Sequence, residues 1–224
     1  MTKVLVNFVQ DRSGSMSSVW EETMSGFKEF VKGLKENKEG VEYTFTLTTF
    51  DTLIETPFIA KPISEIPGDA LIDHGPRGST ALYDAVGATL KNTEGVVADK
   101  YIMVIVTDGQ ENSSREWAKD ALQKAVESHI ARGNWTFTYL GTQPETWADA
   151  QAFGLAAGAA ASYTPTMARS AYRVTGQAVQ SLASSKIAGT KSLMSDFVPD
   201  KVAEEAGMKK DAPTKKKSKA GRWR

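Results

Sequence analysis

The chain has 224 residues, of which 41% are hydrophobic and 24% are charged, and its formal net charge is zero. This composition is typical of a folded domain with a substantial core and excludes a fully disordered chain. The absence of cysteine excludes disulfides and thiolate metal sites and favours a reducing compartment.

The N-terminal apolar run, residues 4–9, is only about half as long as a membrane-spanning segment must be. Asp11 follows this run, where a signal peptide would need small residues for cleavage. We therefore expect a cytoplasmic protein without a membrane segment, or a virion-associated protein if a phage encodes it.

The first predicted elements are a strand and a helix. Residues 4–9 are a nearly continuous apolar run, which is typical of a strand buried on both faces. Over residues 17–37 apolar side chains recur every three or four positions, which predicts an amphipathic helix with Ser17 or Ser18 as its N-cap.

Two runs rich in β-branched and aromatic residues come next, 41–50 and 52–60. Their close junction at Asp51 predicts a hairpin. Because Pro57 cannot donate a ladder hydrogen bond, the second strand is predicted at a sheet edge. Prolines and glycines punctuate residues 61–80, so this stretch is predicted to be mostly loop.

Helices and strands alternate in the C-terminal half. Their predicted order is a helix from Ala81 to before Gly95, a strand over 101–107, a helix over 114–132, a strand over 135–141, a short helix opened by Pro144 and ending near Phe153, a strand over 161–164 and a helix over 167–185. This order predicts an α/β domain over residues 1–186, with a mostly parallel sheet covered on both faces.

The last residues differ in composition. Residues 187–206 are expected to be a linker, and residues 207–224 form a basic tail with six lysines and two arginines against one aspartate, a net charge of +7. Such a tail is expected to be disordered. Two interpretations remain open: a solvated end, or a segment that contacts nucleic acid or an acidic surface.

Oxygen-bearing side chains gather where the predicted strands end. Asp11, Ser13 and Ser15 occupy alternate positions after the first strand, and Asp108 follows the strand that is the second buried apolar run. If these strands are parallel neighbours, about 4.8 Å apart, both carboxylates emerge at the same sheet edge. Thr80 precedes a predicted helix and can reach the same edge.

These five residues offer two carboxylates and three hydroxyls. Hard oxygen donors of this kind favour Mg²⁺, or Mn²⁺, over zinc or copper. Two carboxylates balance the charge of the cation, and hydroxyls add coordination without adding charge. The sequence therefore predicts a metal site that can accept one more carboxylate, brought by another molecule.

Three short motifs together resemble the metal-ion-dependent adhesion site of von Willebrand factor A-type domains: DRSGS at 11–15, GST at 78–80 and TDG at 107–109. The element order is similar over residues 2–185, and the tail lies outside the resemblance. The resemblance implies a Rossmann-like, doubly wound sheet with one antiparallel edge hairpin and helices on both faces. It also implies a binding module rather than an enzyme, in which a protein partner's Asp or Glu completes the metal shell, and it is nearest in build to stand-alone bacterial and phage members.

Other functions remain open. A structural or assembly component, in a phage particle or a nucleoprotein complex, would dock through the basic tail instead. Magnesium-dependent phosphoryl transfer on an aspartate would use a second acid two residues after Asp11 and a lysine after the strand at 135–141, and the sequence has neither. A serine hydrolase would have to rely on His74, and the P-loop and dinucleotide-binding motifs are absent from the sequence.

Overall fold

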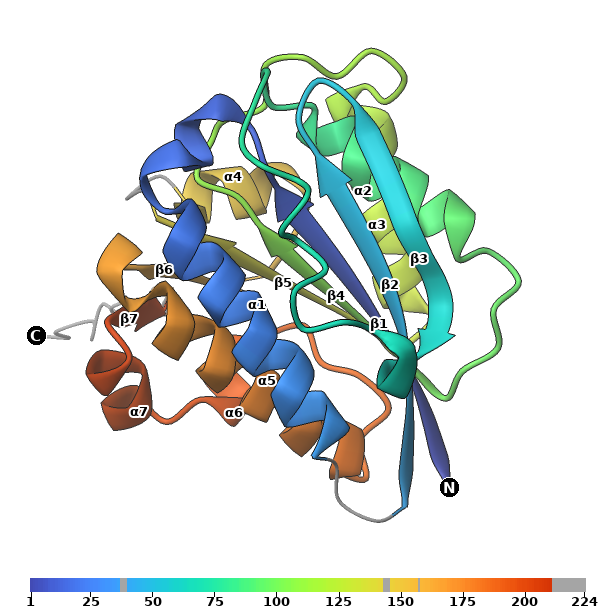
Figure 1. Ribbon diagram of the computed structural model, residues 1–224. Helices are drawn as coiled ribbons and strands as arrows, with labels where there is room; N and C mark the ends of the chain where they lie inside the picture. The colour runs from blue at the N-terminus through green and yellow to red at the C-terminus, as the bar shows by residue number, and fades with distance from the viewer. Residues whose placement is uncertain (37–39, 143–145, 157, 211–224) are drawn as a thin grey trace, which may run out of the picture.

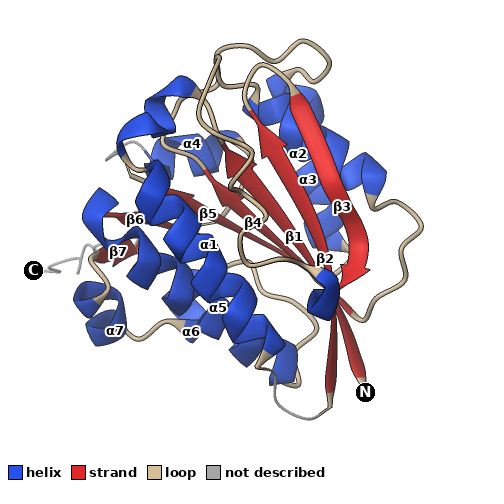
Figure 2. Ribbon diagram, in the orientation of Figure 1, coloured by secondary structure: helices blue, strands red, loops and turns tan. Residues whose placement is uncertain are grey.

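The computed structural model describes residues 1–36, 40–142, 146–156 and 158–210. These residues form one seven-stranded sheet with helices packed on both faces (Figures 1 and 2). The strands are β1 (Thr2–Asp11), β2 (Val41–Phe50), β3 (Ile54–Pro62), β4 (Lys100–Val106), β5 (Trp135–Gly141), β6 (Ala160–Tyr163) and β7 (Met208–Lys210). The α-helices are α1 (Trp20–Lys35), α2 (Leu82–Asn92), α3 (Lys119–Ala131), α4 (Thr146–Ala152), α5 (Ala168–Ser184), α6 (Leu193–Phe197) and α7 (Asp200–Glu205). Three short 3₁₀ helices are η1 (Gly14–Ser18), η2 (Ile63–Glu65) and η3 (Pro165–Met167).

The sheet has the strand order β3-β2-β1-β4-β5-β6-β7. Neighbouring strands from β2 to β6 run parallel, and the chain winds outwards in both directions from the β1–β4 pair. β3 pairs antiparallel with β2 at one edge, which confirms the predicted hairpin. β7 pairs antiparallel with β6 at the other edge, and this second antiparallel pair was not predicted.

The alternation of side chains along the central strands divides the core into two halves. On one face, the side chains of Val4, Val6 and Phe8 pack into the half of the core that contains α1 and α5. On the other face, Val9 belongs to the half that contains α2 and α3. Figure 1 shows the two helix layers on opposite sides of the sheet. Both faces of β1 are therefore buried, as the continuous apolar run predicts.

Two helices begin later than the sequence predicts. The stretch predicted as the start of the first helix forms η1, and α1 begins only at Trp20 with Val19 as its N-cap residue. Neither Ser17 nor Ser18 caps α1, because Ser17 Oγ instead donates a hydrogen bond to the carbonyl of Gly14 at 2.7 Å.

The helix predicted over 114–132 begins at Lys119. The Asp84 carboxylate accepts hydrogen bonds from the backbone N–H groups of Arg115, Glu116 and Trp117, at 2.7–2.9 Å. These long-range hydrogen bonds hold residues 115–117 in a non-helical conformation, so they cannot form the first turn of the helix. The end of α3 was predicted correctly, since Gly133 follows it with a φ of 82°.

The expected linker over 187–206 is wrong from Leu193 onwards. This region contains α6 and α7, and the side chains of Leu193 and Met194 are fully buried in the core. Residues 208–210, at the start of the expected tail, form β7, while residues 211–224 lie outside the described part of the chain. The predicted role of Pro144 also lies outside it, although α4 itself is described.

Among the described residues, no helix is long and apolar enough to cross a membrane.

Candidate metal-binding site

The loop after β1 folds its own polar groups around Asp11. The backbone N–H of Ser13 donates to Asp11 Oδ1 at 2.6 Å, which turns the chain sharply at the strand end. The hydroxyls of Ser13 and Ser15 then lie 3.0 Å apart. Asp11 and Ser13 are buried, whereas Ser15 is exposed, so the cluster lies at the surface with its acidic end inside.

Asp108 lies beside this loop because β1 and β4 are parallel neighbours, with Gln10 paired to Val106. The arrowheads of both strands point to the same end of the sheet in Figure 1. Ser15 Oγ donates to Asp108 Oδ1 at 2.7 Å, and Thr107 Oγ1 donates to Asp11 Oδ2 at 2.5 Å. The two carboxylates thus belong to one hydrogen-bonded cluster.

Gly109 shows that Thr80 belongs to the same cluster. A Cβ atom added to Gly109 would lie 2.8 Å from Thr80 Oγ1, 3.4 Å from Ser15 Oγ and 3.6 Å from Asp11 Oδ2. Oxygen atoms from two segments, the loop after β1 and the Thr80 segment, therefore lie around one small space beside this glycine. The structure brings together all five residues that the sequence singles out.

Backbone hydrogen bonds position the Thr80 segment. Thr80 does not cap α2, whose N-cap residue is Ala81. Instead, its N–H donates to Asn112 Oδ1 at 2.9 Å, and its carbonyl accepts the Asn112 N–H at 3.0 Å. The Gly14 N–H donates to the carbonyl of Gly78 at 3.1 Å, which joins this segment to the loop after β1. Asn112 was not singled out from the sequence.

A buried arginine next to Asp11 was also missed. The guanidinium of Arg12 lies 2.9 Å from Asp51 (Nε to Oδ2) and 2.8 Å from Glu55 (Nη2 to Oε1). Arg77 contacts the same two carboxylates, at 2.9 and 3.0 Å. The acid that could have indicated a partner for Arg12 is Asp51, which directly follows β2. Because Asp11 is paired with Phe50, the residues that follow them, Arg12 and Asp51, lie near each other.

Three other titratable side chains, those of His74, His129 and Asp84, lie outside the cluster. His74 is held by Arg12 and Glu55, with its Nδ1 at 2.9 and 3.3 Å from their nearest atoms. His129 packs against Trp135, with ring centroids 4.6 Å apart. Asp84 supports the loop before α3, because its carboxylate accepts the backbone N–H groups of that loop.

The electrostatics of the cluster favour a bound cation. Burial raises the pKa of Asp11 to about 6, and burial also raises the pKa of Asp108. Burial deprives an ionised carboxylate in this position of solvating water. A bound cation would stabilise the ionised form in place of that water. Within the described residues, no three or more His, Cys, Asp and Glu side chains are grouped to hold a metal. Any metal here would depend on two carboxylates and neighbouring hydroxyls, a donor set that fits Mg²⁺ or Mn²⁺.

No protein-family model matches the chain, and no curated protein matches it in sequence. Solved structures do match it. The PilB minor pilin from Streptococcus sanguinis has a TM-score of 0.55 at 11% identity, covering 80% of this chain and 61% of that one. A von Willebrand factor type A protein from Catenulispora acidiphila has a TM-score of 0.54 at 18% identity, covering 78% of this chain and 42% of that one. The manganese-loaded TRAP protein from Plasmodium vivax has a TM-score of 0.53 at 12% identity, covering 77% of this chain and 74% of that one.

The chain thus spans less than two-thirds of the pilin and of the Catenulispora protein. At such low identity, the likeness concerns the path of the backbone. The shared architecture is the mixed sheet with helices on both faces described above. This chain has the fold of von Willebrand factor A-type domains.

Proposed function

We propose that the chain is a divalent-metal-dependent protein-binding module. The observation that supports this most directly is the convergence of Asp11, Ser15 and Thr80 oxygens on the space beside Gly109, with Asp108 hydrogen-bonded to Ser15. In this proposal the cation, Mg²⁺ or Mn²⁺, supplies a positive centre with affinity for a further anionic oxygen.

The residues have distinct roles in this proposal. Asp11 and Asp108 supply the negative charge that a dication needs. Ser13, Ser15 and Thr80 supply neutral oxygens, so the charge of the cation is balanced but not exceeded. The surface position of Ser15 leaves the site open to a partner, and the expected partner group is the carboxylate of an Asp or Glu.

We favour binding over catalysis. His74 is the histidine on the loop that leads to Thr80, and its ring nitrogen is engaged by Arg12 and Glu55 rather than by a serine of the cluster. A Ser-His-Asp arrangement would need a hydrogen bond between a serine of the cluster and the His74 ring. The pairing of His74 therefore argues against nucleophilic catalysis by Ser13 or Ser15.

Titration of the protein with Mg²⁺ and Mn²⁺ in a calorimeter tests the metal part of the proposal. Wild type should bind one ion per chain, and Asp11→Asn and Thr80→Ala should weaken or abolish binding. Ser18→Ala is the matched control, because Ser18 is exposed in η1, which also contains Ser15, and is not one of the five residues. Equal affinity in all four proteins would refute the site.

Capture from a native host lysate tests the partner. Wild type and Asp11→Asn are compared with Mg²⁺ and with EDTA, and the lysate is used before and after carbodiimide amidation of its carboxylates. The expected partner appears only with wild type, Mg²⁺ and unmodified lysate. A partner captured equally from amidated lysate would show that its carboxylates are not what the site recognises.

A further inference from the structure

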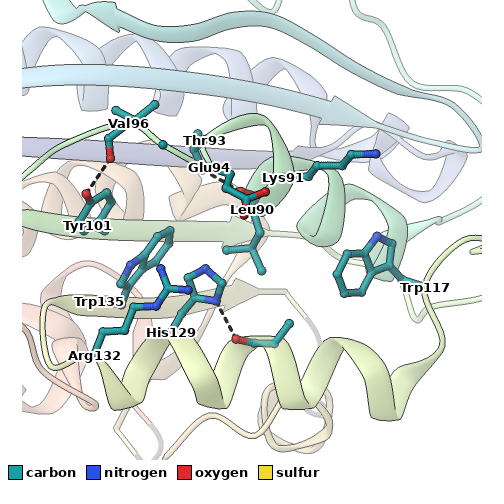
Figure 3. Close-up of a pocket in the computed structure, with 12 residues that line it drawn as sticks. Leu90, Lys91, Thr93, Glu94, Val96, Tyr101, Trp117, His129, Arg132 and Trp135 are labelled. Atoms are coloured by element: carbon teal, nitrogen blue, oxygen red, sulfur yellow. Dashed lines mark hydrogen bonds between the residues drawn. The ribbon is translucent and has the colours of Figure 1, made fainter.

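A second candidate site lies near the N-terminal ends of β4 and β5, at the opposite end of the parallel strands from Asp11. It is a pocket of about 360 Å³ between the end of α2, the chain that follows it and α3 (Figure 3). This volume lies within the range of about 300–1,000 Å³ that is usual for small-molecule sites. Tyr101, in the pocket, and Asp108, in the metal cluster, are separated by roughly 20 Å of β4, at about 3.3 Å per residue. The two sites share no residue.

One wall of the pocket is aromatic. The rings of Tyr101 and Trp135 stack with centroids 4.7 Å apart and planes inclined by 6°, because the two residues are paired across β4 and β5. The His129 imidazole meets the Trp135 indole edge to face. Tyr101 also donates its hydroxyl hydrogen to the carbonyl of Val96 at 2.7 Å, which fixes the chain over the pocket.

Trp117 forms the other side. Its indole lies against α2 at Gly87, where an added Cβ would be only 2.2 Å from Trp117 Cε2. Figure 3 shows Trp117 and His129 on opposite sides of Leu90, which also lines the pocket. Trp117 and His129 are half-buried, so a flat ring between them would complete the burial of two aromatic side chains.

The hydrogen bonding of His129 defines what its ring offers to a ligand. Its Nδ1 lies 2.7 Å from the carbonyl of Ala125, which can only accept, so Nδ1 bears the hydrogen. Burial lowers the pKa of His129, which favours the neutral ring. The remaining nitrogen, Nε2, is then an acceptor and would match a ligand N–H or O–H donor.

The charges at the rim favour an anion. Arg132 and Lys91 are exposed cations that line the pocket, against the single carboxylate of Glu94. Across the described residues, no carboxylate lies within ion-pairing distance of either cation. Figure 3 shows the Arg132 guanidinium beside the His129 imidazole. One net positive charge next to an aromatic wall suits a ligand with one carboxylate.

We propose that this pocket binds a small planar aromatic carboxylate that has an N–H or O–H donor on its ring. The ring lies over Leu90 between His129 and Trp117, the ring donor bonds to His129 Nε2, and the carboxylate pairs with Arg132. This site is independent of the metal cluster and does not rest on the proposed function.

The probe is indole-3-acetate, followed by the NMR signals of the indole N–H groups in ¹⁵N-labelled protein, with Trp117→Phe and Trp135→Phe used for assignment. We expect saturable shifts at Trp117 and Trp135 that are the same with Mg²⁺ and with EDTA. Indole-3-acetamide lacks the charge and cyclohexylacetate lacks the aromatic ring, and each should bind about tenfold more weakly or worse.

Arg132→Gln should weaken the binding of indole-3-acetate by about tenfold, as replacing its carboxylate with the amide of indole-3-acetamide should do. Lys124→Gln is the matched control, because Lys124 is an exposed cation on α3 that does not line the pocket. Equal affinity for all three probes, shifts that do not saturate, or an unchanged affinity in Arg132→Gln would each overturn the proposal.

Discussion

The guanidinium of Arg12 and the carboxylate of Asp51 form a buried ion pair, with Nε and Oδ2 2.9 Å apart and both side chains at most 3% exposed. This pair connects the two loops of the metal cluster. Arg12 accepts the Arg77 N–H through its backbone carbonyl, and Asp51 accepts the Ala81 N–H in the same way. The residues on either side of Thr80 are thus tied to the ends of β1 and β2.

Removing Arg12 should therefore destabilise the fold. Arg12→Ala leaves the Asp51 carboxylate buried, and among the described residues the partly exposed Arg77 is then the remaining cation that contacts it. We therefore expect the unfolding free energy to fall by about 3–5 kcal/mol. Urea unfolding measures this loss. Arg77→Ala is the control, because Arg77 is 55% exposed although it contacts the same acids, and it should destabilise the protein much less than Arg12→Ala does. Similar losses in both variants would contradict a special role for the buried arginine.

Gly109→Ala should abolish metal binding while the fold persists. The new methyl group would lie 2.8 Å from Thr80 Oγ1 and would occupy the space that the cluster surrounds. Metal titration and circular dichroism of the same samples separate the two effects. Gly75→Ala should behave as wild type, since an added Cβ there meets nothing within 4 Å. Wild-type metal affinity in Gly109→Ala would mean that the ion does not use this space.

The cluster can be predicted from the sequence because each strand that leads to it has a recognisable local pattern of apolar residues. A strand that is apolar on both faces must be central, and parallel central strands end at one edge, which brings Asp11 and Asp108 together. The start of α3 could not be predicted in this way. Asp84 holds the N–H groups of residues 115–117 from 31 to 33 positions away in the sequence, and such a contact overrides local helix propensity.

The C-terminal region was misjudged for a related reason. Leu193, Met194 and Met208 are buried, yet they are too irregularly spaced to show a helical or strand period. These residues are held in place by packing against the edge of the sheet and against α5. Arg12 was missed because a charged residue next to a strand end is ordinarily solvated, and only the register with β2 places an acid beside it.

Lys100 stabilises the end of α5, and its replacement should separate stability from metal binding. Its Nζ donates to the carbonyls of Leu182, Ala183 and Ser185 at 2.7–3.1 Å. Lys100→Met leaves these carbonyls without the charged donor, so we expect unfolding free energy to fall by about 2–4 kcal/mol. Metal affinity should not change, because Lys100 lies at the start of β4 and Asp108 follows the other end of that strand. Lys124→Met, on an exposed surface, is the control for loss of a positive charge.

The stability of the metal-free protein should decrease as the pH rises from about 4 to about 6. Burial raises the pKa of Asp11 from 3.8 to about 6, so over this window the folded state holds a proton that the unfolded state has released. The loss is up to about 3 kcal/mol, and a bound cation should remove it. Arg12 holds the pKa of Glu55 at about 2, so the opposite effect of that residue falls at lower pH. Urea unfolding in EDTA and in Mg²⁺ should therefore give a difference that grows with pH for wild type and is absent for Asp11→Asn. A metal-free stability that is flat or rising across this window would show that Asp11 ionises as freely in the folded chain as in the unfolded one.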